Sequence, residues 1–224
     1  MHQGYPEYHS YYYRDIIAIG GSVAPDMLIK LYNKGLFPWY NEGVDPILWW
    51  SPNPRLVLFP KNIKIQRSMR TYFNNSKFSV TYNSCFEKIM LRCQLTSRGG
   101  YVGSWINEEL IASFTELHHQ GLAHSIEVWQ NNELVGGLYG LAFGKVFFGE
   151  SMFAEIPNAS KFGFITLVKF LESQGFTLID CQAETNHLRS MGADTISRED
   201  FLEILKENQN YPLNYLYTKL VDSC

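Results

Sequence analysis

The chain has 224 residues, of which 46% are hydrophobic and 18% charged, and its formal net charge is −3. A chain of this length and composition can bury one large core or two small ones. No apolar run approaches the roughly 18 residues that a membrane helix needs, so a membrane-spanning class is excluded. The start of the chain lacks the basic and apolar pattern of a signal peptide, and its four cysteines form no CxxC pair. We therefore expect a cytoplasmic protein with reduced thiols.

Residues 1–90 are predicted to form a small N-terminal α/β domain that is rich in aromatic rings. After a tyrosine-rich start between residues 5 and 13, a helix is predicted over residues 25–34, which Pro25 begins and Gly35 ends. The motifs GLFPWY and DPILWWSPNPR follow, with three tryptophans and four prolines between them. Because prolines fix the path of a loop at little entropic cost, these rings can be held in place for a ligand.

The second half of this domain carries basic residues. Short strands are predicted over residues 55–59 and 63–65, and the segment QRSMRTYFNN is typical of a short helix. The basic residues in or beside that helix are Lys61, Lys64, Arg67 and Arg70. They form either an ordinary solvated face or a local patch for nucleic acid, because binding depends on the face presented and not on the net charge.

Two amphipathic helices join this part to the rest of the chain. A strand over residues 78–82 precedes the first helix, which we expect Asn83 to cap. A glycine-rich loop then leads to Trp105, and the second helix ends at Gly121. The domain boundary is predicted near residue 90, so residues 91–224 form the second domain.

Three β-strands in a row form the centre of the second domain. Alternating residues and turn signals predict strands over residues 125–130, 133–143 and 146–153. The middle strand contains three glycines, which favour a bulge or a close approach of a ligand to the main chain. The third strand carries a lone acid, Glu150, among aromatic residues, and such an acid lies either at a rim or in a functional site.

A buried helix and a buried strand follow. The helix begins near Ser160 and is apolar over much of its circumference. The strand FTLIDCQ is flanked by helices in the sequence, which implies a parallel neighbour, and it contains Asp180 and Gln182. A last helix begins at a capping box formed by Ser197 and Asp200. The expected fold class is therefore α+β with a mixed sheet.

Common catalytic signatures are missing from this sequence. GESMF lacks the second glycine of a nucleophile elbow, and the GK pair that follows the middle strand lacks the other residues of a phosphate loop. The histidine cluster, His118, His119 and His124, has no suitably spaced acid. We therefore expect no metal site.

Two polar side chains lie at the ends of predicted strands, Glu150 and Gln182, with Asp180 beside the second. A glutamine carbonyl can accept a hydrogen bond from an attacking amine, and a nearby carboxylate can polarise it or take charge. Such a site suits aminolysis of an activated ester, in which positioning does most of the catalysis. On these residues alone, a hydrogen-bonded structural glutamine remains the alternative.

Motifs along most of the chain resemble one known family. Between about residues 18 and 205 the chain contains, in order, GLFPWY, DPILWWSPNPR, AHSIEVW, ELVGGLYG, FFGESMF, NASK and LIDCQ, followed by HL and MGA. This combination resembles leucyl/phenylalanyl-tRNA-protein transferase. The resemblance implies a small N-terminal domain and a C-terminal acyltransferase domain of the GNAT kind. It also implies transfer of Leu or Phe, and weakly Met, from aminoacyl-tRNA to the N-terminal Arg or Lys of a protein, which marks that protein for N-end-rule degradation.

The same resemblance implies roles for individual residues. Glu150 holds the α-amino group of the aminoacyl moiety, and Gln182, supported by Asp180, assists the attacking amine. Trp39 and Trp105 match the aromatic residues around the 3′-terminal adenosine. The implied Leu/Phe pocket contains Leu138, Phe147, Met152, Phe164, Leu167 and Ile179. The implied contacts to the tRNA backbone are Lys61, Lys64, Arg67 and Arg70. No cofactor is implied, and we expect a monomer that works on aminoacyl-tRNA and protein substrates.

The chain departs from the family pattern at two places. QRSMRTYFNN is poorer in Lys and Arg than the basic helix of the family, with Thr71, Asn74 and Asn75 at or near expected charges, which predicts a smaller electrostatic contribution to tRNA binding. Thr185 stands where some members have Asn. Two other functions stay open: a GNAT-like N-acyltransferase that uses acyl-CoA, against which the missing pyrophosphate loop argues, and a non-catalytic, aromatic-rich binding module.

Overall fold

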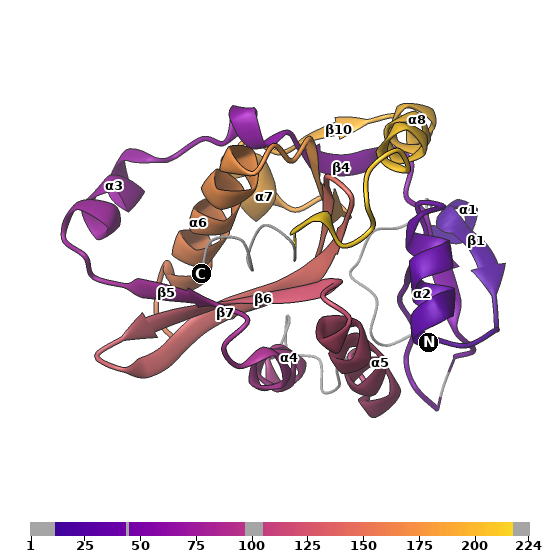
Figure 1. The fold of residues 1–224 in the computed structure, drawn as a ribbon, viewed down its shortest axis with the longest axis horizontal. Coiled ribbons are helices and arrows are strands. Elements are labelled where there is room, and N and C mark those ends of the chain that lie inside the picture. The colour runs from indigo at the N-terminus through magenta and orange to yellow at the C-terminus, as the bar shows by residue number, and fades with distance from the viewer. Residues whose placement is uncertain (1–11, 44, 97–104, 217–224) are drawn as a thin grey trace.

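The computed structural model describes residues 12–43, 45–96 and 105–216, which form two sheets and the helices around them (Figure 1). Most of the tyrosine-rich start and of the glycine-rich loop before Trp105 lies outside these described residues. The smaller sheet has the strand order β1-β3-β2. Its strands are β1 (Ile16–Ile19), β2 (Phe37–Pro38) and β3 (Leu48–Trp50). With the short α1 (Tyr12–Asp15) and with α2 (Pro25–Tyr32), this sheet forms one end of the molecule (Figure 1).

The larger sheet has seven strands in the order β10-β4-β9-β8-β7-β6-β5. These strands are β4 (Arg55–Leu58), β5 (Ser79–Tyr82), β6 (Ala123–Gln130), β7 (Glu133–Phe143), β8 (Val146–Ala154), β9 (Leu178–Gln182) and β10 (Asp194–Ile196). Only β8 and β9 pair in parallel, and the other neighbouring strands are antiparallel. The predicted α+β class with a mixed sheet is therefore confirmed.

Helices cover both faces of the larger sheet (Figure 1). One face packs against α4 (Phe86–Leu95) and α5 (Glu108–His119), and the other against α6 (Ala159–Ser173). Eight residues of α6 are buried, as its apolar sequence predicts. Each fully buried Leu, Ile or Phe stabilises such a contact by about 1.5 to 3 kcal/mol.

Alternation along the strands divides the interior into two hydrophobic cores. In β8, Phe148 belongs to the core that also includes α4, α5 and the N-terminal end, and Phe147 belongs to the core under α6. In β9, Leu178 and Ile179 divide in the same way. Successive residues of a strand point to opposite faces, so any polar residue in these strands is assigned to one core by its position.

The remaining elements lie along the edges. The 3₁₀ helix η1 (Pro60–Asn62) and α3 (Arg67–Asn74) follow β4, and α3 lies at the end of the molecule opposite α2 (Figure 1). The short α7 (Asn186–Ser190) leads to β10, and α8 (Arg198–Asn208) follows. The Ser197 hydroxyl accepts a hydrogen bond from the Asp200 amide, so the predicted cap of this last helix is confirmed.

Two local predictions are wrong. Residues 63–65 form no strand, because the chain turns through η1 and runs on to α3. Asn83 does not cap α4, whose N-cap is Cys85. The side-chain oxygen of Asn83 instead accepts a hydrogen bond from the Ser125 amide at 3.0 Å. The Asn83 backbone is left-handed there (φ 57°), at the end of β5.

The domain boundary near residue 90 stays a prediction, but the sheet bears on it. Strands β4 and β5 precede this boundary and nevertheless belong to the larger sheet. β4 lies between β10 and β9, and β5 pairs with β6 at the edge. The chain from about residue 55 onward therefore contributes to the body that carries the candidate site.

Candidate active site

The candidate site lies where two neighbouring parallel strands separate. The pairing of β8 with β9 spans Val146–Phe148 and Leu178–Asp180, and both strands continue past it. Glu150 comes two residues after this pairing in β8, and Gln182 comes two residues after it in β9. Their side chains meet across the opening, where Gln182 Nε2 donates to Glu150 Oε1 at 2.9 Å.

A bulge in β8 turns Glu150 into this position. Gly140 of β7 pairs with Gly149, and Tyr139 pairs with Ser151, so Glu150 is the extra residue between two rungs of the ladder. Gly140 permits the bulge, because a Cβ there would lie 2.2 Å from the carbonyl oxygen of Phe148. Bulges commonly re-aim a side chain beside an active site. The glycines of the middle strand predicted a bulge in that strand itself, and β7 has one at Val135, where its pairing with β6 shifts; the bulge at Glu150 is on its other neighbour, β8.

Both hydrogen bonds to the Glu150 carboxyl use the same oxygen. Oε1 accepts from the Tyr32 hydroxyl at 2.8 Å and from Gln182, whereas Oε2 is buried and has no hydrogen-bond partner among the described residues. Burial raises the pKa of Glu150 to about 8, and the charge of Asp180 adds to this effect. The hydrogen bonds from Tyr32 and Gln182 and the charge of Arg55 act in the opposite direction.

Tyr32 remains a donor in this arrangement. It is the last residue of α2 and is buried, and burial together with the Glu150 charge raises its pKa well above the usual range. Its ring meets Phe148 edge to face at 5.4 Å, which fixes the hydroxyl over the opening between the strands.

Asp180 is held by a buried ion pair. Arg55 donates from Nε to Oδ1 at 2.7 Å and from Nη2 to Oδ2 at 2.6 Å, and the two side chains are 1% and 0% exposed. The rings of Phe37 and Phe201 lie 4.8 and 4.7 Å from the guanidinium carbon, so three separate parts of the chain hold this arginine. A bidentate pair of this kind fixes geometry as well as charge.

Asp180 in turn fixes the backbone of Gln182. Its Oδ1 accepts the Gln182 amide at 2.9 Å, and Gln182 has a left-handed backbone with φ 61°. A residue other than glycine rarely adopts this conformation, and it persists only where the surroundings impose it. Because the side-chain NH₂ of Gln182 points to Glu150, its carbonyl oxygen is turned away and can accept another donor.

The six predicted pocket residues also come together. Leu138 pairs with Met152 across β7 and β8, and Phe147 pairs with Ile179 across β8 and β9. Phe164 and Leu167 reach them from α6, in the core under that helix. Five of the six are buried, and Met152 is half-buried. The polar cluster, by contrast, lies toward the other core, so the two predicted groups occupy opposite faces and meet where the strands separate.

The family of the chain follows from comparison with known proteins. The family model described as leucyl/phenylalanyl-tRNA protein transferase matches residues 57–206, and its N-terminal domain model matches residues 21–53. A leucyl/phenylalanyl-tRNA–protein transferase of Hydrogenovibrio crunogenus is 51% identical over 192 residues, which cover 86% of this chain and 75% of the relative. One of Christiangramia forsetii is 53% identical over 192 residues, covering 85% and 90%. The chain belongs to the leucyl/phenylalanyl-tRNA protein transferase family. The family recognised from the motifs is therefore confirmed, and the chain is an enzyme of the transferase class.

Solved structures resemble this transferase only distantly. A GCN5-related N-acetyltransferase from Kribbella flavida has a TM-score of 0.37 and 11% identity, and the match covers 77% of this chain and 61% of that one. A GCN5-related N-acetyltransferase-like protein from Streptococcus suis has a TM-score of 0.39 and 12% identity, covering 77% and 64%. Likenesses at these scores carry no argument about the chemistry of the transferase.

The two predicted adenosine residues lie on the same side as the polar cluster. Trp39 and Trp105 are partly buried and pack against the core that contains Tyr32 and Phe148. Trp39 lies 5.6 Å from Trp50, whose indole donates to the Trp39 carbonyl at 2.7 Å. The aromatic loop is therefore fixed to the small sheet, as its prolines predict.

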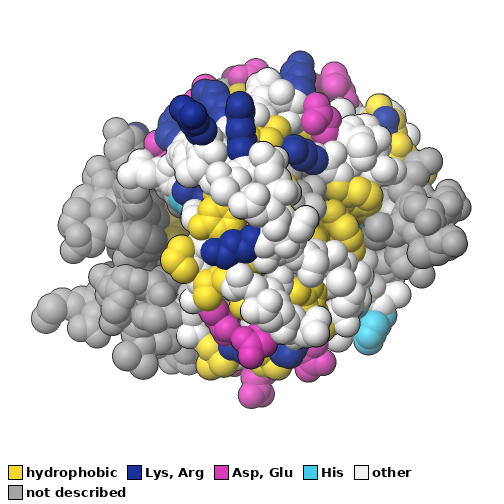
Figure 2. All heavy atoms as spheres, turned by 90° about the vertical axis from the view of Figure 1, so that its left-hand side faces the viewer, with side chains coloured by type: hydrophobic (Ala, Val, Ile, Leu, Met, Phe, Trp, Pro, Cys, Tyr) yellow, Lys and Arg dark blue, Asp and Glu magenta, His cyan; other side chains and the backbone are white. Residues whose placement is uncertain are grey.

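The four predicted basic residues lie elsewhere in the transferase. Lys61 is in η1, Lys64 follows it, and Arg67 and Arg70 are on α3, all with exposed side chains. Lys and Arg side chains gather on the upper part of the face at the α3 end of the molecule (Figure 2). This is an exposed surface, in contrast to the buried cluster between β8 and β9.

Sequence reasoning missed two members of the polar cluster, Tyr32 and Arg55. Arg55 could have been noticed because it directly precedes the apolar run LVLF. A charged residue beside a buried strand indicates a buried partner of opposite charge. Tyr32 resembled any apolar residue on the buried face of its helix. Tyr32 is far in sequence from its partner Glu150, and Arg55 is far from its partner Asp180, so neither pairing could be assigned from the spacing of residues.

No group of three or more His, Cys, Asp or Glu residues that could hold a metal ion occurs in the described part of the transferase. Two histidines of the predicted cluster are described by their surroundings. His118 Nδ1 lies 2.8 Å from the Ala123 carbonyl oxygen, and burial lowers the pKa of His124 to about 3, so that ring is neutral. Within the same residues, no helix is long and apolar enough to cross a membrane.

Proposed function

We propose that the chain transfers Leu or Phe, and weakly Met, from aminoacyl-tRNA to the N-terminal Arg or Lys of a protein, and so marks that protein for N-end-rule degradation. We further propose that it works in the cytoplasm as a monomer without a cofactor. Membership in the transferase family and the names of its relatives support the donor and the reaction class.

The observation that carries this proposal is the arrangement of two side chains between β8 and β9. The Oε2 atom of Glu150 is buried and has no hydrogen-bond partner in the described part of the chain, which suits it to bind the α-amino group of the aminoacyl moiety. Gln182 presents its carbonyl oxygen from a rigid backbone position, which suits it to accept a hydrogen bond from the incoming amine. A glutamine is not a base, so its contribution is to orient the nucleophile.

The reaction balances without an additional group. The amine of the acceptor attacks the ester carbonyl carbon, the C–N bond forms, and the bond from that carbon to the 3′ oxygen of the terminal adenosine breaks. The proton lost by the amine ends on that released oxygen. In this scheme Asp180 and Arg55 act as positioning residues, because they hold Gln182 in its left-handed conformation and do not touch the reacting atoms.

The remaining site residues supply recognition. Trp39 and Trp105 stack on the terminal adenosine in this proposal, from the side of the polar cluster. The Leu or Phe side chain enters the apolar group beside Met152, the half-buried member. Methionine adapts its shape readily, and one methylene more or less discriminates by only about 1 to 3 kcal/mol, so two different side chains are tolerated.

The test is transfer of labelled Leu from charged tRNA to a peptide that begins with Arg, beside acetyl-CoA as a donor. We expect incorporation of Leu from charged tRNA into the Arg peptide and no incorporation into a matched peptide that begins with Glu. Incorporation from the CoA thioester alone would instead support an acyl-CoA enzyme, and none from either donor would support a binding module. Gel filtration of the same protein tests the monomer.

A further inference from the structure

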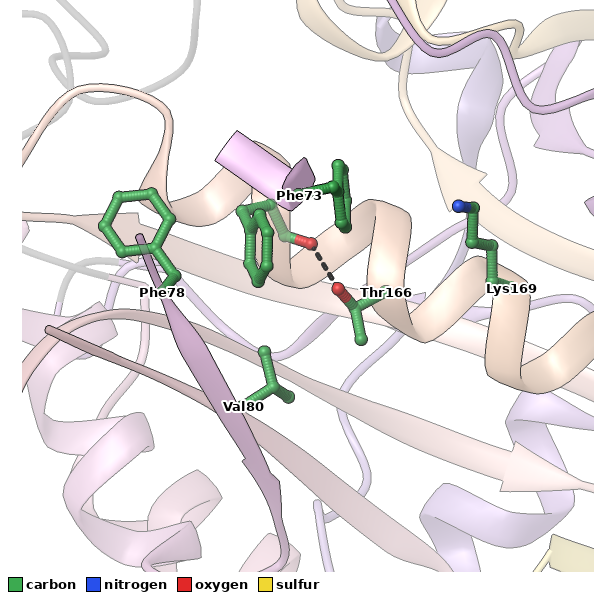
Figure 3. Close-up of a pocket in the computed structure, with 6 residues that line it drawn as sticks. Phe73, Phe78, Val80, Thr166 and Lys169 are labelled. Carbon is green, nitrogen blue, oxygen red and sulfur yellow. Dashed lines mark hydrogen bonds between the residues drawn. The ribbon is translucent and has the colours of Figure 1, made fainter. Parts of the chain in front are cut away.

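A hollow in the surface between α3, β5 and α6 lies apart from the polar cluster. It has a volume of about 310 Å³ and is lined by Phe73, Phe78, Val80, Phe162, Thr166 and Lys169. Figure 3 shows Phe73 and Phe78 above Val80, with Thr166 and Lys169 following along α6. We call these six residues the aromatic slot.

The walls of the aromatic slot are rings held by one another. Phe73 stacks on Phe162 at 4.3 Å, and Phe78 meets Phe162 edge to face at 5.3 Å. The Thr166 hydroxyl donates to the Phe162 carbonyl at 2.8 Å within its own helix (Figure 3). Phe78 and Phe162 are themselves buried (5% and 6% exposed), so the half-buried Phe73 supplies the ring surface on which a flat ligand group can stack.

Cationic groups lie beside the rings of the aromatic slot. The ammonium of Lys169 lies 5.0 Å from the ring centre of Phe73, and that of Lys77 lies 4.9 Å from Tyr72 and 5.8 Å from Phe78. Both lysines are exposed, so their remaining donors face solvent. The rim therefore pairs aromatic faces with positive charge.

The sequence around the aromatic slot concentrates this charge. Between Asp45 and Glu87 the chain has no Asp or Glu, although the whole chain has a net charge of −3. The cations of this stretch are Arg55, Lys61, Lys64, Arg67, Arg70 and Lys77. All except the buried Arg55 are exposed, and Lys and Arg side chains gather on the upper part of the face that Figure 2 shows. Such a surface attracts a polyanion.

We propose that the aromatic slot receives one unstacked nucleobase of the tRNA, while Lys77 and Lys169 contact the phosphates on either side of it. This rests on the proposed function, in which charged tRNA is the donor. The other apolar occupant available to such an enzyme is a side chain of the acceptor protein. Charge argues against it, because the proposed acceptors begin with Arg or Lys and the rim of the slot is itself cationic.

The stacking part is tested with Phe73→Ala, which removes one wall, and Thr166→Phe, which fills the slot. Binding of charged Leu-tRNA, measured by fluorescence anisotropy, should weaken by about 5- to 150-fold for Phe73→Ala. An aminoacyl-adenosine analogue, which has no second base, should bind as to the wild type. Leu91→Ala removes an exposed apolar side chain from α4, on the other face of the sheet, and should change neither affinity. If Thr166→Phe does not fold, Thr166→Leu replaces it.

The ionic part is tested with Lys169→Gln, with Lys206→Gln on α8 as the matched exposed control. Each phosphate contact contributes about 0.7 to 0.9 to the slope of log affinity against log salt concentration, so only Lys169→Gln should lower that slope by this amount. Phe73→Ala should leave the slope unchanged, because stacking releases no counterions.

Three results would overturn the proposal. One is unchanged tRNA affinity in folded Phe73→Ala and slot-filled variants. Another is an equal loss for the aminoacyl-adenosine analogue, which would place the effect inside the active site. The third is a raised KM for the acceptor peptide with unchanged tRNA affinity, which would assign the slot to the acceptor protein. If the wild type binds charged tRNA but transfers no amino acid, the proposed function is contradicted. The binding measurements on the slot variants would then still test the proposed base-binding role of the slot.

Discussion

Two buried groups of side chains meet at β8 and β9, and different forces hold them. On one face, Arg55, Asp180, Gln182, Glu150 and Tyr32 form a chain of directed hydrogen bonds of 2.6 to 2.9 Å. On the other face, six apolar side chains pack without direction under α6. Hydrogen bonds fix angles and distances, whereas packing fixes mainly volume.

In the proposed mechanism, this difference separates reactivity from selectivity. The polar group has little freedom, because each change leaves a buried donor or acceptor without its partner. The apolar group can change shape and still fill its space. Substitutions in the first group should therefore impair turnover, and substitutions in the second should alter which amino acid is accepted.

The largest effect is expected from Arg55→Met, which leaves Asp180 charged and alone in the interior. Removing one partner of a buried ion pair costs about 3 to 5 kcal/mol of unfolding free energy. Denaturant unfolding should show this loss, and Arg92→Met, in an exposed pair with Glu155, should lose about 1 kcal/mol or less.

The double variant Arg55→Met with Asp180→Asn sharpens this test. Removing both charges should restore much of the stability, because no unpaired ion remains. Turnover should stay low, because the amide that replaces the carboxylate is uncharged and no longer held by Arg55, and so accepts the Gln182 backbone N–H less firmly. Recovery of both stability and turnover would show that the pair has no positioning role.

Gln182→Ala is the next largest change and addresses the polar group alone. Turnover should fall by about 10²-fold or more with little change in tRNA binding, because the contact to the attacking amine matters chiefly in the transition state. Gln182→Asn keeps an amide and tolerates the left-handed backbone, but its shorter side chain should leave turnover low. Equal turnover in single-turnover assays of all three proteins would make Gln182 purely structural.

Phe164→Ala tests the apolar group. It should shift preference from Leu toward a bulkier side chain such as Trp, and it should lower the unfolding free energy by about 2 to 5 kcal/mol. Leu117→Ala, fully buried in the other core, is the matched control with a similar loss and no shift. Competition between Leu-tRNA and Trp-tRNA measures the preference. The pocket lies elsewhere if both variants keep the wild-type ratio.

The last prediction concerns the pH dependence of stability. The pKa of Glu150 is about 8 in the folded protein against 4.5 as the ordinary value, so the folded state binds an additional proton between these pH values. Stability should therefore fall as the pH rises from about 4.5 to 8, by at most about 1.4 kcal/mol per pH unit. Glu150→Gln should flatten this part of the curve of melting temperature against pH. An unchanged slope would indicate a normal pKa.

Local patterns predicted much of the fold. The three central strands, the buried α6 and the apolar β9 with a parallel neighbour are confirmed, because each rests on a pattern within one short segment. The cap at Asn83 was wrong because a tertiary partner, the Ser125 amide, competes for the same oxygen. Helix-capping propensity is a local property and takes no account of a hydrogen-bond partner 42 residues away in the sequence.

The site was predictable in part for the same reason. Glu150 and Gln182 are conspicuous as polar residues at the ends of apolar strands. The partners Tyr32 and Arg55 lie 118 and 125 residues from the groups they bind, and only the folded sheet brings them there. The apolar pocket was placed by family resemblance, but its position on the opposite face of the sheet required the register of the strands.

The place of β4 in the larger sheet has a consequence for how the protein is made. This strand is synthesised early, yet its two neighbours, β9 and β10, are among the last elements of the chain. Pairings between such distant segments form slowly, because a long loop must close before they stabilise anything. A nascent chain that ends before residue 196 lacks a neighbour of β4, and one that ends before residue 180 has no partner for Arg55. The enzyme should therefore become active only once nearly its whole length has left the ribosome.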